Sequence, residues 1–173
     1  MQRVIELTGW EPLGLSVDWT AMEEELQCPL PADYKELFEA FGGGVFSESV
    51  YFLARDEGIS FDFLAQWRAE LSTDRDSSLG SVSAMDPYAV YAPGGKGLVT
   101  WASTEWGDQY CWLLDAERPG EHPVLARVED NEWRRYDMST SEFLYRVLTD
   151  ADFKPFGIAR YNLDKTFRRR GGE

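Results

Sequence analysis

The fold is decided by residues 98–115, which read LVTWASTEWGDQYCWLLD. Two runs rich in Val, Leu, Thr, Trp and Tyr flank a short polar segment that contains Gly107. This pattern predicts a β-hairpin whose loop is longer than the two-residue minimum. Nearly every position of both runs is apolar, which is typical of strands in the middle of a sheet. The loop carries Glu105, Trp106 and Asp108, and loops held by a rigid scaffold often carry function.

The segment before this hairpin is predicted to be largely helical. Residues 1–17 are interrupted by glycine and proline, which indicates an extended lead-in. Asp18 can cap a first helix that ends before Pro29. Apolar residues at helical spacing predict a second helix over about 31–41, which Gly42-Gly43-Gly44 stops.

Mixed elements are predicted between the second helix and the hairpin. A short apolar strand is expected over 50–53, and helical spacing from Phe61 to Leu71 predicts a third helix. Residues 72–86 are rich in Ser, Asp, Thr and Gly, which favours an irregular surface loop. A further strand is predicted over 88–93.

Two strands and a helix are predicted after the hairpin. The strands are expected over 124–129 and 133–136. Ser139 and Glu142 have the spacing of a capping box, which predicts the start of the last helix. The tail, 150–173, is expected to pack back onto the body through its aromatic residues, with a frayed basic end at 168–170.

Together these elements predict an α+β fold, with an antiparallel sheet (a meander) of about four to six strands packed against N-terminal and C-terminal helices. The 173 residues suit a single domain spanning 1–173, with its core at about 19–149 and the tail packed on it. Helices are expected to back one face of the sheet. The opposite face, with the 72–86 and 103–108 loops at its rim, is the expected concave surface.

The formal charge of −14 excludes some partners and favours others. Nucleic-acid binding requires clustered Lys and Arg, so this chain would be repelled by DNA or RNA. A strongly acidic small protein is either simply soluble or built to meet a basic partner. No run of about eighteen apolar residues and no signal peptide is evident, so a cytoplasmic location without membrane contact is expected.

The residues needed for common enzyme chemistry are scarce. Catalytic triads depend on histidine, and the chain has only His122, which is expected on the surface. Cys28 and Cys111 are expected to be reduced and partly buried, so neither a metal site nor a cofactor is predicted. Glu105 and Asp108 could share a proton or hold a cation, but neighbouring carboxylates arise by chance among 31 acids. We therefore expect no enzymatic activity and no catalytic residues.

Three short motifs follow one another along the chain. The first is Leu30-Pro31-Ala32-Asp33-Tyr34-Lys35 with the helix that Gly42-Gly43-Gly44 closes. The second is Gly107-Asp108 with the strand through Trp112, and the third is Trp133 followed by Ser141-Glu142-Phe143-Leu144. In this order, over about 19–149, the motifs resemble the SUKH superfamily. The resemblance implies an α+β fold and, in bacteria, an immunity protein that neutralises a toxin, often a nuclease or a deaminase acting on nucleic acids.

The hairpin loop is the predicted partner-binding site. Glu105, Trp106, Asp108 and Tyr110 are its expected contact residues, and a cognate toxin domain of basic character is the expected partner. Trp106 has an alternative, which is to fold back and pack on the sheet. The protein is expected to be a monomer or weak dimer. A regulatory or scaffold protein that binds a cellular protein or peptide is the alternative function.

Overall fold

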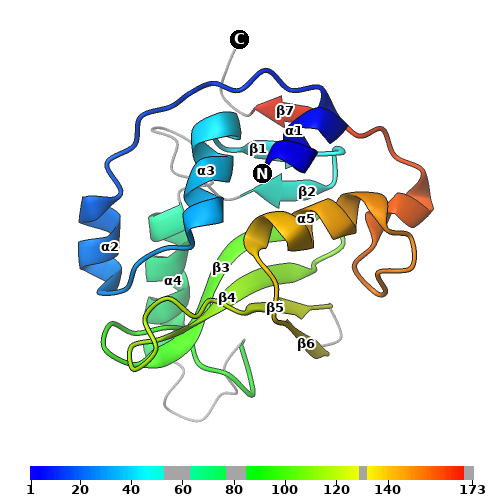
Figure 1. Ribbon diagram of the computed structural model, residues 1–173. Coiled ribbons are helices and arrows are strands. Elements are labelled where there is room, and N and C mark those ends of the chain that lie inside the picture. Colours follow the sequence, from blue (N-terminus) through cyan, green and yellow to red (C-terminus); the bar gives the residue numbers. More distant parts are fainter. Residues whose placement is uncertain (53–62, 77–84, 129–131, 170–173) are drawn as a thin grey trace.

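The structure, a computed structural model, describes residues 1–52, 63–76, 85–128 and 132–169. At its centre is an antiparallel sheet of seven strands in the order β6-β5-β4-β3-β2-β1-β7 (Figure 1). The strands are β1 (Gly44–Phe46), β2 (Val50–Phe52), β3 (Lys96–Thr104), β4 (Gln109–Asp115), β5 (Val124–Arg127), β6 (Trp133–Tyr136) and β7 (Phe167–Arg169). The predicted α+β class and antiparallel meander are confirmed, with one strand more than the upper expectation.

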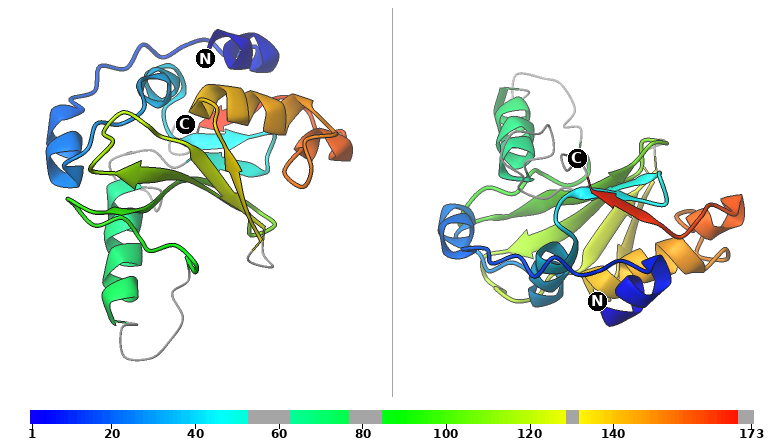
Figure 2. Two further views of the ribbon diagram at one scale, coloured as in Figure 1. Left: turned by 60° about the horizontal axis from the view of Figure 1, so that its bottom comes forward. Right: turned by 90° about the horizontal axis from the view of Figure 1, so that it is seen from above.

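Helices lie on both faces of this sheet (Figure 2). They are α1 (Gln2–Thr8), α2 (Thr20–Leu26), α3 (Ala32–Phe41), α4 (Phe63–Asp76), α5 (Thr140–Thr149) and the 3-10 helix η2 (Ile158–Tyr161). α1, α3 and α5 pack over one face, whereas α4 lies against the other and contacts β3. The expectation that helices back only one face is therefore wrong.

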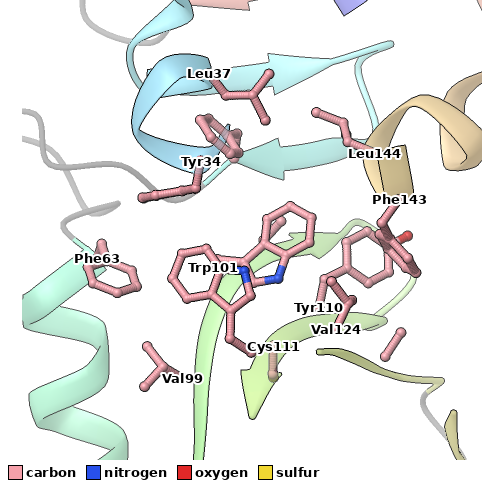
Figure 3. Packing of buried hydrophobic residues seen from close by; sticks show 14 of the residues in the cluster. Tyr34, Leu37, Phe63, Val99, Trp101, Tyr110, Cys111, Val124, Phe143 and Leu144 are labelled. Carbon is pink, nitrogen blue, oxygen red and sulfur yellow. The ribbon is translucent and has the colours of Figure 1, made fainter. Parts of the chain in front are cut away.

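The predicted hairpin is confirmed as β3 and β4, at the middle of the sheet. The two strands pair from Lys96–Asp115 to Ser103–Gln109, and a register shift between Thr100 and Ala102 forms a β-bulge at Trp101. Trp101 lies beneath α3 and α5 (Figure 3), and its ring stacks on that of Trp112 with centroids 6.0 Å apart. Because both faces of these strands are covered, the near-continuous apolar pattern has a structural cause.

Helices α3 and α5 follow the sequence pattern closely. α3 buries Tyr34, Leu37, Phe38 and Phe41 on one stripe and ends at Gly42, whose φ of 68° is easily adopted by glycine. α5 begins at the predicted Ser139, whose hydroxyl accepts a hydrogen bond from the Glu142 backbone N–H at 3.2 Å. The Glu142 carboxylate forms an ion pair with Arg3 at 2.6 Å.

Two N-terminal predictions are corrected. Residues 2–8 form α1 and not an extended lead-in, because Val4 is buried against the core and Arg3 pairs with Glu142 of α5. Asp18 is not the N-cap of α2, which is Trp19, although the Asp18 carboxylate accepts a hydrogen bond from the Thr20 N–H at 3.0 Å. β1 was absent from the prediction since three residues carry too little periodicity to be recognised.

Three further predictions are corrected. Residues 72–76 continue α4 and are not irregular, while 77–84 lie outside the described residues, as does Phe61. The strand expected over 88–93 reduces to one bridge between Val90 and Leu98. Residues 168–169 are not frayed, because they pair with β1 as part of β7.

Candidate functional site

Two turns and a 3-10 helix meet at one end of the sheet and form what we call the sheet-end surface (Figure 1). The β1–β2 turn, the β3–β4 turn and η2 contribute its side chains, and their contacts are short. The Glu105 N–H donates to the Ser49 carbonyl at 3.1 Å, and the Ser49 hydroxyl donates to the Glu105 carboxylate at 3.0 Å. The side chains that define this surface are Glu48, Glu105, Trp106, Asp108, Arg160 and Tyr161.

The β3–β4 turn is held by its own hydrogen bonds. Thr104 N–H donates to the Asp108 carbonyl at 3.0 Å, and the Asp108 N–H donates to the Thr104 hydroxyl at 3.2 Å. Gly107 has a φ of 85° and donates to the Thr104 carbonyl at 3.2 Å. Since L side chains rarely adopt that φ, glycine allows the tight turn that projects Glu105 and Trp106 into solvent.

The neighbouring β1–β2 turn adds a carboxylate on strained backbone. Ser47 and Glu48 both adopt positive φ, 49° and 57°, the conformation that asparagine and glycine usually supply in two-residue hairpins. The Ser49 N–H donates to Phe46 at 3.0 Å, and the Ser47 N–H donates to Thr166 at 2.8 Å. This arrangement costs conformational energy and leaves Glu48 exposed at the same end of the sheet as Glu105.

Trp106 does not fold back onto the sheet. Its side chain is 38% exposed, and its ring packs against Tyr161 of η2, which is 47% exposed, with centroids 4.7 Å apart. The Arg160 guanidinium lies 4.8 Å from the Tyr161 ring centre and donates to the Tyr161 hydroxyl at 2.9 Å. The ring pair is therefore partly exposed, and the Arg160 guanidinium lies against its Tyr161 member.

Tyr110 lies in the core, so its prediction as a partner-contacting residue is wrong. It is fully buried, and its ring meets Phe143 at 5.0 Å and Phe156 at 5.7 Å. Burial raises its pKa well above the usual value, with the nearby Asp108 charge adding to the effect. Tyr110 pairs with Ala102 on the face that α5 covers, whereas Asp108 ends the turn.

The thiols of Cys28 and Cys111 are free, as predicted, and unreactive. Burial raises the pKa of Cys111 to about 12, and burial also raises the pKa of Cys28. Both are therefore protonated thiols near neutral pH and poor nucleophiles. His122 is hydrogen-bonded through Nε2 to the Pro29 carbonyl at 2.7 Å. In the described part of the chain, no group of three or more His, Cys, Asp or Glu side chains could hold a metal ion.

A cavity of about 650 Å³ lies beside the N-termini of α3 and α5. Its charged side chains are engaged within the protein. Asp33 accepts a hydrogen bond from the Ser141 N–H at 2.6 Å, which joins the starts of the two helices. Arg135 pairs with Asp137 at 2.8 Å. This cavity is built around internal contacts, in contrast to the exposed rings of the sheet-end surface.

At least one residue from each of the three motifs quoted from the sequence lies at the joint beside this cavity. The Tyr34 ring meets the Trp112 ring edge-on at 4.6 Å, and the Trp112 indole N–H donates to the Thr140 hydroxyl at 3.0 Å. Asp33 completes the set through its bond to Ser141. These residues join α3, β4 and α5, so the motifs hold the fold together.

Comparison with protein families agrees with this arrangement. The profile of the SUKH_6 family, described as SMI1-KNR4 cell-wall, matches residues 17–144. The chain belongs to the SUKH family. Proteins of this family are generally non-enzymatic immunity proteins that act through a protein partner. Neither the curated proteins nor the solved structures contain a match to the chain.

The SUKH match divides the sheet-end surface in two. Glu48, Glu105, Trp106 and Asp108 lie inside the matched residues 17–144, whereas η2 lies outside them. The surface therefore combines two turns from the matched residues with η2, which lies outside them.

The described helices include none that is long and apolar enough to cross a membrane.

Proposed function

We propose that the protein is a non-enzymatic immunity protein that binds and neutralises a toxin domain through the sheet-end surface. The observation that carries the proposal is the exposed Trp106–Tyr161 ring pair, whose Trp106 shares its turn with Glu105 and Asp108 and lies next to the turn that carries Glu48. Aromatic anchors supply much of the energy of protein interfaces, and charges at the rim guide encounter. A nuclease or nucleic-acid deaminase that acts in the cytoplasm is the proposed target.

The charge of the chain supports this class of target. A protein that acts on nucleic acid needs a positive groove to hold the polyanionic substrate. A chain with a formal charge of −14 is attracted to such a groove, and its exposed carboxylates can occupy the places of phosphates. Binding there would block the active site without any chemistry by the immunity protein.

A regulatory protein is the second candidate, since the matching family is described as SMI1-KNR4 cell-wall. Such a protein would present the same surface to a cellular protein or peptide. Protection from a toxin distinguishes the two functions, because a regulator would leave the toxin active.

The test is co-expression with the C-terminal domain of the toxin whose gene adjoins this one, scored by cell survival. The parent chain should protect, and the double variant Glu105→Lys with Asp108→Lys should not, while its melting temperature changes little. Glu24→Lys with Glu36→Lys is the matched control, because it makes the same charge change on exposed positions of α2 and α3. Loss of protection in the control alone would place the interface on α2 and α3.

Salt dependence supplies a second measurement on the purified complex. Raising salt from about 0.05 M to about 0.5 M should slow association by roughly an order of magnitude, because exposed charges are screened. Dissociation should change much less. An association rate that ignores salt would contradict electrostatic steering by this surface.

A further inference from the structure

The Trp106–Tyr161 ring pair already carries one cation. The Arg160 guanidinium lies 4.8 Å from the Tyr161 ring centre, and its second contact is a hydrogen bond to the Tyr161 hydroxyl at 2.9 Å. A cation above an aromatic ring is attracted by the negative face of the π system. The surface is thus shaped for cationic side chains, and it holds one in the unbound protein.

Arg160 is held less firmly than Arg3 and Arg146, two other arginines that lie over aromatic rings. Arg3 lies 3.7 Å from the Tyr145 ring centre and also pairs with Glu142 at 2.6 Å. Arg146 lies over Phe153 and pairs with Asp150 at 2.9 Å. Among the described residues, no carboxylate lies within 4 Å of the Arg160 guanidinium. Arg160 can therefore leave the ring without breaking an ion pair.

We infer that the ring pair is the docking point for an arginine or lysine side chain of the protein partner, and that Arg160 is an internal cation which competes for it. Glu105 directly precedes Trp106, and exposed Glu48 lies on the turn that is hydrogen-bonded to Glu105, so this end of the sheet can offer an incoming cation the carboxylates that Arg160 lacks. The inference rests on the proposed function, since it names the partner group that this surface receives.

The position of η2 in the chain separates Arg160, the competing internal cation, from the SUKH core. Tyr161 and Arg160 lie outside residues 17–144, the part that matches the SUKH family. A change in this segment would alter the strength of the surface without touching the core that the family shares. η2 thus sets how strongly a cationic partner is bound.

The test is a titration of the ¹⁵N-labelled full chain with a hexa-arginine peptide, followed by the indole N–H resonance of Trp106. That resonance is assigned by comparison with Trp106→Phe. The hexa-arginine peptide should shift it saturably, and a hexaglutamate peptide should not. Arg160→Ala should lower the dissociation constant roughly two- to fivefold, the equivalent of one exposed cation–π contact. Tyr161→Ala should raise it, while Tyr161→Phe should retain binding.

Arg3→Ala is the matched control, because it removes the same positive charge and also an arginine lying over a tyrosine, on α1. General attraction of a polycation to a more acidic protein would strengthen binding equally in both variants. An equal effect, or weaker binding by Arg160→Ala, would overturn the inference. A toxin domain that binds while hexa-arginine leaves Trp106 unmoved would overturn it too and leave the proposed function standing. Peptide binding without protection from the toxin would instead overturn the proposed function alone.

Discussion

Aromatic and charged side chains are buried or hydrogen-bonded in one region of the molecule and exposed in another. Around the cavity, Trp112 is fully buried and its indole N–H is used by Thr140, while Asp33 is bonded to Ser141. At the sheet-end surface, Trp106 and Tyr161 are 38% and 47% exposed, and their rings pack on each other with Arg160 against Tyr161. The cavity beside α3 and α5 is therefore a structural joint, and the projecting turns of the sheet-end surface are the candidate interface.

This contrast shows what family membership explains in this protein. Tyr34, Trp112 and Ser141, which belong to the motifs that resemble the SUKH superfamily, lie at the joint where α3, β4 and α5 meet, whereas Asp108 of the second motif lies in the β3–β4 turn. Tyr161, which supplies one ring of the exposed pair, comes from beyond the matched residues. A shared core can therefore keep its fold while the surface beside it changes its partner.

Trp112→Ala should have the largest effect, and it tests whether the role of the joint is structural only. The substitution opens a cavity beside Tyr34 and leaves the Thr140 hydroxyl without its indole donor. The free energy of unfolding should fall by about 3–5 kcal/mol, measured by urea denaturation. The fraction that stays folded should bind the toxin domain as the parent does. Weaker binding per folded molecule would show that the joint is also an interface.

Trp106→Ala should show the reverse pattern. Removing an exposed ring should change the free energy of unfolding by less than about 0.5 kcal/mol. If Trp106 is a buried anchor in the complex, binding should weaken by about 2 kcal/mol, mostly through faster dissociation. Surface plasmon resonance separates the two rates. Leu13→Ala, which trims another exposed apolar side chain, is the control and should leave both rates unchanged.

Asp33→Ala tests the polar part of the joint. The substitution removes the carboxylate that accepts from the Ser141 N–H at the start of α5. A lost cap of this kind should lower the free energy of unfolding by about 1–2 kcal/mol. Asp33→Asn keeps an acceptor and should cost less. Equal losses in the two variants would show that charge, and not the hydrogen bond, stabilises this end of α5.

Sequence patterns were sufficient for the parts of the fold that carry their own periodicity. The β3–β4 hairpin and helices α3 and α5 each show it, and all three are confirmed. β7 has no such pattern, since two of its three residues are arginine, and it exists only because it pairs with β1. α1 likewise depends on the distant contact between Arg3 and Glu142.

The candidate site was predictable only in part, for related reasons. Gly107 and its acidic neighbours marked an exposed turn, and the structure places Glu105 and Trp106 there in solvent. Tyr110 was misassigned because both faces of β4 are apolar, so the inward and outward positions cannot be told apart. Tyr161 was missed because its contact with Trp106 joins segments that are far apart in the sequence.

The smallest expected effect is the pH dependence of stability that the partly buried carboxyl group of Glu70 causes. Glu70 of α4 accepts from the Thr100 hydroxyl and the Gln66 amide, and burial raises its pKa above the usual value. The stability that neutral Glu70 contributes is present below its ordinary pKa and is lost as pH rises through the raised value. Glu70→Gln should therefore match the parent near pH 4 and be more stable near pH 7, measured by urea denaturation at each pH. Glu24→Gln, at an exposed position, is the control and should show no such gain in stability near pH 7. A Glu70→Gln variant that is less stable than the parent near pH 7 would show that the ionised carboxylate stabilises α4 against β3.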